Sequence, residues 1–134
     1  MANTKQTIID GIGTALTALS GINLATRDHK SPKDNRVHAP YVGIVSMNEA
    51  VIVDDGTNIR WGSDLELILM KKGDDIEKMI DIVKDAMLVG MAATVGALEI
   101  RLVANFKVAQ VEKDPYSSSR MFFEFIYVST KGAA

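Results

Sequence analysis

Residues 58–71 constrain the fold more than any other feature of the sequence, because apolar residues recur at every second position over most of this run. Alternate residues of a strand point to opposite faces of a sheet. One face would carry Ile59, Trp61, Leu65, Leu67 and Leu69, and the other Arg60, Asp64 and Glu66. At ~3.3 Å per residue the strand spans roughly 50 Å, whereas a domain of 134 residues has a radius of gyration near ~14 Å. We therefore expect this strand to bend, to bulge or to project beyond the domain.

Two segments have the three- and four-residue apolar spacing of amphipathic helices. The first covers residues 3–21, with the stripe Ile8, Ile9, Ile12, Leu16 and Leu19. The second begins at Asp74, which forms a capping signature with Glu77, and has the stripe Ile76, Met79, Ile80, Val83 and Met87. Gly11 and Gly13 each cost about 1 kcal/mol of helix propensity relative to alanine. We therefore expect the first helix to form only by packing on the rest of the domain.

The remaining pattern predicts strands joined by short turns. The predicted strands are residues 22–27, 41–47, 50–53, 58–71, 97–111 and 120–129. In the fifth, Leu98, Ile100, Leu102, Ala104, Phe106 and Val108 would share one face. A turn is expected at Asp114-Pro115 and at the serines 117–119. The order helix, four strands, helix, two strands predicts a single α+β domain over residues 1–134, a mainly antiparallel sheet with two helices packed on one face.

Two of the predicted strands are apolar on both faces, which is more than one layer of helices can cover. The last strand has Met121, Phe123, Phe125 and Tyr127 on one face. Its other face has Phe122, Ile126 and Val128 beside Arg120 and Glu124, and residues 41–47 are likewise apolar on both faces. Either a neighbouring subunit or the first helix would cover the second face. We favour a subunit, and the predicted interface residues are Tyr41, Val45, Met47, Phe122, Ile126 and Val128.

The residue types leave little room for catalysis. The chain has no cysteine and two histidines, His29 and His38, which excludes a disulfide framework, a thiolate nucleophile and a cysteine-ligated metal. The segment 54–56, Asp-Asp-Gly, fits a tight turn, because a calcium loop would place its final glutamate at Gly62. The most apolar segment, residues 86–98, is shorter than the ~20 residues that a membrane span needs. We expect no catalytic residue, metal, cofactor or membrane contact.

Basic residues gather in residues 27–36, although the net charge of the chain is −2. Arg27, Lys30, Lys33 and Arg36 lie there against only Asp28 and Asp34. A solvated loop is the simpler interpretation, and contact with phosphate or an acidic partner is the alternative. Two further functions stay open: a small hydrolase that combines a loop histidine with surface carboxylates, and a DNA-binding accessory protein.

The order of these elements and the apolar pattern of the strands resemble those of one protein family. A leading amphipathic helix is followed by the Pro-led strand Ala39-Pro40-Tyr41-Val42-Gly43-Ile44 and by the long strand of residues 60–69. A helix then starts at an aspartate, and a hairpin through Asp114-Pro115 leads into residues 120–128. Over nearly its full length the chain resembles the tail terminator, or tail completion, proteins of long-tailed bacteriophages. Neck and head-completion proteins of the head–tail connector are the alternative.

The resemblance implies a structural virion protein without enzymatic activity. The chain would assemble in the host cytoplasm and form a ring, commonly a hexamer, on the head-proximal end of the tail tube. There it would end tube polymerisation, bind the tube protein and present a docking surface to the neck protein, with sheath protein as a neighbour in a contractile tail. DNA would pass through the ring without specific binding. The loop with Arg27, Lys30, Lys33 and Arg36 would contact a neighbouring subunit or the tube.

Overall fold

The computed structural model describes residues 4–26, 40–73, 76–108 and 115–130, which form one sheet of five strands and three helices. The elements are α1 (Thr4–Thr17), β1 (Leu24–Thr26), β2 (Tyr41–Asp54), β3 (Asn58–Lys72), α3 (Glu77–Leu88), α4 (Met91–Val95), β4 (Glu99–Val108) and β5 (Tyr116–Thr130). The spatial order of the strands is β1-β2-β3-β5-β4. Every pairing is antiparallel except that of β1 with β2. This arrangement confirms the predicted α+β class.

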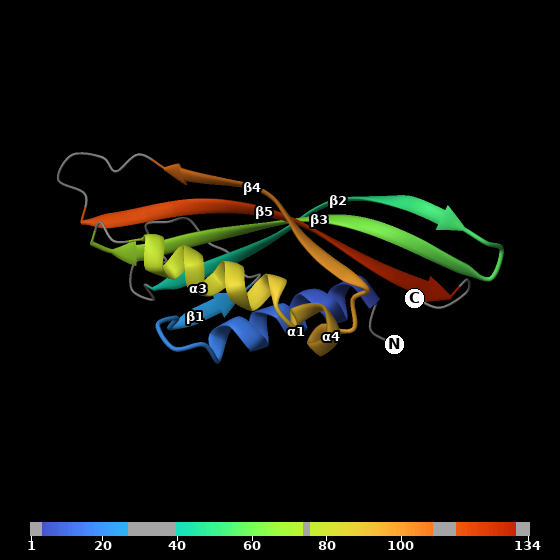
Figure 1. Cartoon of the computed structure of the whole chain (residues 1–134), viewed down its shortest axis with the longest axis horizontal. Helices are drawn as coiled ribbons and strands as arrows, with labels where there is room; N and C mark the ends of the chain where they lie inside the picture. The colour runs from blue at the N-terminus through green and yellow to red at the C-terminus, as the bar shows by residue number, and fades with distance from the viewer. Residues whose placement is uncertain (1–3, 27–39, 74–75, 109–114, 131–134) are drawn as a thin grey trace.

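All three helices lie on the same side of the sheet (Figure 1). We call this side the inner face; its strand residues include Leu65, Leu67, Leu69, Phe123 and Phe125, all at most 1% exposed. The predicted helical stripes supply the rest of the core: Ile8, Ile9, Ile12 and Leu16 from α1, and Met79, Ile80, Val83 and Met87 from α3. The first helix therefore does not cover the opposite face of the sheet.

Gly11 shows why a residue that weakens an isolated helix stands in α1. A Cβ atom at this position would lie 3.0 Å from Cγ1 of Val95 in α4, a tighter contact than most Cβ atoms make, so Val95 would have to shift. The missing side chain allows α1 and α4 to approach, so the loss of helix propensity is offset by contact between the two helices.

The number of strands before the second helix was predicted wrongly. Residues 41–47 and 50–53 belong to a single strand, β2, so three strands precede α3. Between Ser46 and Glu49 the strand advances three residues while β3 advances two, from Leu65 to Ser63. This register shift is a β-bulge, which absorbs an extra residue without ending the strand. The local break in the apolar pattern therefore marks a bulge and not a turn.

Three local predictions also need correction. The Gly- and Ala-rich connection after α3 contains the short helix α4, bounded by Gly90 and Gly96 at φ of 82° and 83°, where glycine is favoured. The serines 117–119 lie in β5, paired with β3, rather than in a turn. Helix α3 begins at Glu77 after Ile76, without a side-chain cap; the predicted cap at Asp74 lies outside the described residues.

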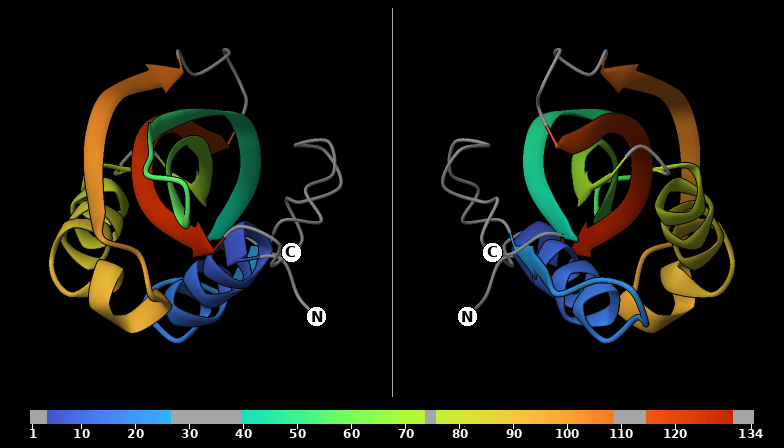
Figure 2. Two further views of the ribbon diagram at one scale, coloured as in Figure 1. Left: turned by 90° about the vertical axis from the view of Figure 1, so that its right-hand side faces the viewer. Right: turned by 90° about the vertical axis from the view of Figure 1, so that its left-hand side faces the viewer.

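The long strand does extend past the body of the domain, as its length requires. Figure 1 shows the β2–β3 hairpin and the end of β5 continuing beyond the three helices at the right of the view. Seen along the long axis of the molecule, the strands twist strongly around one another (Figure 2), as expected for long strands with a right-handed twist. Thus projection, twisting and bulging of β2 together accommodate strands of up to 15 residues.

A small polar cluster joins the sheet to the start of α1. The hydroxyl of Tyr127 in β5 donates a hydrogen bond of 2.6 Å to Oε2 of Glu49, just after the bulge in β2. Nζ of Lys5 in α1 lies 3.7 Å from the same oxygen. The ring of Tyr127 is also stacked on Trp61, with 6.5 Å between centroids. These contacts hold the bulged strand to the helix and to its neighbouring strands.

This cluster predicts a loss of stability at alkaline pH. Burial raises the pKa of Tyr127 above its usual value, and the hydrogen bond and charge of Glu49 raise it further. Because the pKa is raised in the folded state, the contribution to stability is complete below the unfolded value of about 10 and is lost as pH rises above it. We expect Tyr127→Phe to reduce this loss, and also to lower stability at pH 7 by about 1.5–3 kcal/mol through the hydrogen bond to a charged group. Urea denaturation between pH 7 and 11 measures both effects. An unchanged pH slope in the variant would contradict the first, and unchanged stability at pH 7 would contradict the second.

Candidate functional site

The side of the sheet opposite the helices, which we call the outer face, carries no element among the described residues. Phe122, Ile126 and Val128 of β5 lie on it, at alternate positions to the buried Phe123, Phe125 and Tyr127. Phe122 and Ile126 are half-buried, while Val128 is 38% exposed. Three of the predicted interface residues therefore lie together on a face that the described part of this chain does not cover.

The other predicted interface residues differ in their positions. Val45 is half-buried on β2, paired with Glu66 of β3. Tyr41 is 1% exposed and so offers no surface to a neighbour. The backbone of Met47 belongs to β2, but its side chain lies outside those that the structure describes.

The basic segment cannot be placed on this surface. Arg27, Lys30, Lys33 and Arg36, together with His29 and His38, fall within residues 27–39, outside the described residues.

Strand β4 contributes two exposed apolar residues that the sequence pattern had not assigned to the interface. A bulge between Leu102 and Ala104 inserts Val103 against β5. Ile100 and Leu102 pack with the core, whereas Val103 is 63% exposed and Phe106 59% exposed. The prediction that the apolar residues of 98–108 share one face is therefore wrong, because the extra residue moves the second half of the strand to the outer face.

These side chains form a pocket on the outer face, which we call the β4–β5 pocket. Its volume is about 260 Å³, and its lining is apolar apart from one carboxylate: Asp64, Val103, Ala104, Phe106, Phe122 and Phe123. The rings of Phe106 and Phe122 meet edge to face, with 5.8 Å between centroids. Such an aromatic pair gives the pocket a defined shape before any partner binds.

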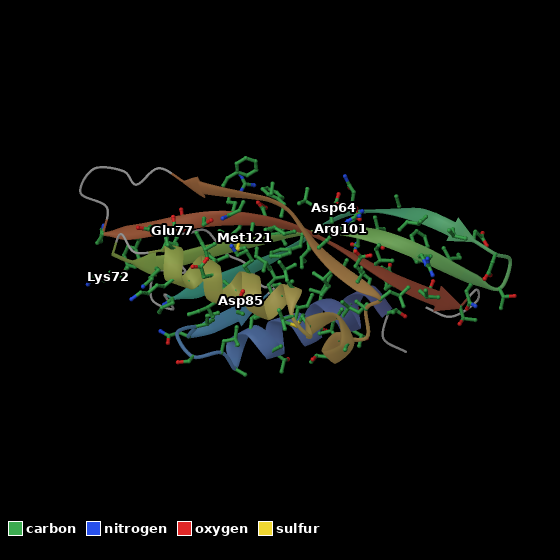
Figure 3. The ribbon with its side chains drawn as sticks, in the orientation of Figure 1. Asp64, Lys72, Glu77, Asp85, Arg101 and Met121 are labelled. Carbon is green, nitrogen blue, oxygen red and sulfur yellow. The ribbon has the colours of Figure 1, made fainter. Side chains whose placement is uncertain are left out.

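Ion pairs border the β4–β5 pocket. Nε of Arg120 donates to Oε2 of Glu66 at 2.6 Å, and its guanidinium lies 5.5 Å from the centroid of the Phe122 ring. Arg101 of β4 pairs with Glu124 of β5. Glu124 is also paired with Asp64 in the strand register, so the three residues form one row across β4, β5 and β3; Figure 3 labels Asp64 and Arg101 on this part of the sheet.

The projecting hairpin ends in a turn of acidic residues. Oδ1 of Asp54 accepts a hydrogen bond from the N–H of Gly56, and Oδ1 of Asp55 accepts from those of Thr57 and Asn58. Gly56 has a φ of 92°, which favours glycine. The segment 54–56 is therefore a tight turn, as predicted, with its carboxylates used locally.

No group of three or more histidine and acidic side chains that could hold a metal ion occurs within the described ranges. In the same part of the chain, no helix is both long and apolar enough to span a membrane. The outer face and the projecting hairpin are thus the candidate functional surfaces among the described residues.

Comparison with known proteins adds no assignment. A scan against protein-family models gave no match, and neither did a search of curated proteins.

Proposed function

We propose that this chain is a structural subunit of a phage tail that forms a ring, commonly a hexamer, at the head-proximal end of the tail tube. The ring would end tube polymerisation and present a docking surface to the neck. One observation carries the proposal: on the side of the sheet away from the helices, Val103, Phe106 and Val128 expose apolar side chains beside the ion pairs, and this sheet projects past its own helices. Exposed apolar surface of this kind marks a protein–protein interface.

The layered architecture suits such a role. A contact between two different surfaces of identical subunits closes into a ring when its rotation is commensurate with a full turn. Specific contacts bury on the order of 800 Å² per partner, and long strands provide area without a larger domain. The same role is supported by the resemblance to tail terminator proteins in the order of elements and in the apolar pattern of the strands.

A neck or head-completion protein of the head–tail connector is the second candidate. The same outer face would then join subunits of a ring on the head side of the last tube ring. The two candidate functions differ only in where the ring lies, so the experiment must locate the ring as well as count its subunits. A small hydrolase would instead depend on a histidine of residues 27–39 together with surface carboxylates, and a DNA-binding accessory protein on Lys30, Lys33 and Arg36.

The test is assembly of tails with and without this chain, followed by cryo-electron microscopy. With the chain we expect tails of uniform length that carry one additional ring of six subunits directly on the last tube ring; without it, tubes should grow past the normal length. Uniform tails in its absence, with the subunit found on the head side, would favour the neck protein. The variant His29→Ala/His38→Ala should assemble normally, since the proposed role uses no catalytic histidine. A chain that stays monomeric in solution and on tails would overturn the proposal.

A further inference from the structure

The tip of the projecting hairpin, residues 51–60, exposes apolar side chains far from the helices. Val51, Ile52 and Val53 are 51%, 49% and 50% exposed. A second bulge in β2, between Val51 and Val53, lets Ile52 lie across β3, where a Cβ at Gly62 would come within 3.2 Å of its Cδ1. Val53 pairs with the exposed Arg60 and lines a shallow site with Val128 of the outer face. The tip therefore exposes aliphatic side chains on both faces of the hairpin, with Val53 on the outer face and Val51 on the inner one.

The β4–β5 pocket is the concave counterpart on the same outer face. Its volume of about 260 Å³ is smaller than the ~300–1,000 Å³ of most small-molecule sites. Branched aliphatic side chains suit its apolar lining better than a polar ligand does. A protein segment with two or three aliphatic residues is the occupant that fits this chemistry.

A single chain cannot bring its own tip to its own pocket. The tip lies beside Val128 and the pocket beside Phe122, six positions apart on the same strand, which is on the order of 20 Å at ~3.4 Å per residue. The continuous pairing of β3 with β5 between them keeps the two apart. The tip that reaches a pocket must therefore come from a second copy.

The exposed charges of the two surfaces are complementary. At the pocket, the side chains of Arg101 and Arg120 are 57% and 51% exposed, whereas those of their partners Glu124 and Glu66 are 24% and 6% exposed. The exposed charged groups there are therefore the two guanidinium groups beside the pocket and the carboxylate of Asp64 in its lining. The tip has the opposite pattern, with exposed Asp54 and Asp55 and the exposed cation Arg60. Complementary charge of this kind orients an apolar contact.

From this match we infer that the hairpin tip of one copy docks in the β4–β5 pocket of the next copy. Each chain gives one tip and accepts another, so the contact joins two different surfaces and propagates around a ring. The inference rests on the proposed function and deepens it, because it names the contact that holds the ring together.

Cross-linking can test this contact because the chain has no cysteine of its own. One batch of full-length chain carries Val53→Cys in the tip, and another carries Val103→Cys at the pocket. After mixing and treatment with a short bismaleimide, we expect a covalent dimer on a denaturing gel that neither batch gives alone. The control is Val89→Cys, at a residue that is 77% exposed just beyond α3; mixed with Val103→Cys it should give no dimer. A chain with both Val53→Cys and Val103→Cys should give a ladder that ends at the subunit number of the ring.

Each outcome decides the inference. A dimer from Val103→Cys alone would mean that two outer faces pack on each other symmetrically, and it would overturn the tip contact. Absence of the mixed dimer would overturn it as well. The proposed function is judged separately: a cross-linked ring that does not end tube growth supports the contact and refutes the tail role. A chain that ends tube growth without the mixed dimer keeps the role and refutes the contact.

Discussion

Replacing Phe125 with alanine is expected to lower the free energy of unfolding by about 3–5 kcal/mol. Its side chain is completely buried on the inner face of β5, and its ring lies 5.8 Å from that of Tyr127. The substitution removes the transfer free energy of the ring and leaves a cavity that the rigid sheet cannot close. A domain of this size has about 5–15 kcal/mol of stability in total, so the variant would lose a large fraction of it.

The matched control is Phe122→Ala, the same substitution on the same strand but on the outer face. Phe122 is only half-buried, in contact with Phe106 and Arg120, so its loss should cost about 1 kcal/mol. Urea denaturation followed by fluorescence of Trp61, the only tryptophan, compares the two variants. Assembly of the oligomeric ring should be affected in the reverse order: Phe122→Ala should weaken it more than Phe125→Ala does, since Phe122 lines the β4–β5 pocket. Equal losses of stability would contradict the assignment of the two faces.

Replacing Arg120 with methionine should have the second large effect: we expect the free energy of unfolding to fall by about 3 kcal/mol. Glu66 is 5% exposed, and Arg120 supplies both a hydrogen bond and an ion pair to its Oε2 atom. Without the guanidinium, a buried carboxylate stays on the outer face with its charge uncompensated. The cost comes mainly from that carboxylate, because desolvated charge without a partner is more expensive than the pair is favourable.

The two partners should therefore respond unequally. Glu66→Met leaves Arg120 with a half-exposed side chain, which water can solvate, so this variant should lose about 1 kcal/mol or less. The double variant Arg120→Met/Glu66→Met should recover most of the loss, since no buried charge remains. The double-mutant cycle, measured by urea denaturation at one pH, gives the coupling free energy. Similar losses from the two single variants would show that the pair, and not the isolated carboxylate, controls stability.

Features that depend on neighbouring residues along the chain were predictable. The stripes of α1 and α3 and the alternation of β3 and β5 appear in the structure, because 3.6- and two-residue periods are local properties of the backbone. Most of the predicted residues are buried, and Leu19, Ile59 and Trp61 are half-buried. The α+β class and the placement of both long helices on one face followed from these patterns. So did the outer face of β5, with Phe122, Ile126 and Val128.

Features that depend on strand pairing were not predictable. The bulge at Ser46–Glu49 made two predicted strands into one, and the bulge at Val103 moved Phe106 from the predicted core to the surface. A bulge exists only relative to the partner strand, so a pattern within one strand does not reveal it. Glu66 shows the same limit: the alternation placed it on one face with Arg60 and Asp64, whereas the structure shows that it is 5% exposed and paired with Arg120 of β5.

By itself, the sequence determined the α+β class, a strand over residues 58–71 that is longer than a compact body accommodates, and the scarcity of reactive side chains. Periodicity, length and residue type are properties of single segments. The tertiary structure decided which end of that strand projects, which apolar side chains reach the outer face, and that Val103, Phe106 and Phe122 surround one pocket. Those outcomes depend on the register between strands distant in sequence, which only the packed sheet defines.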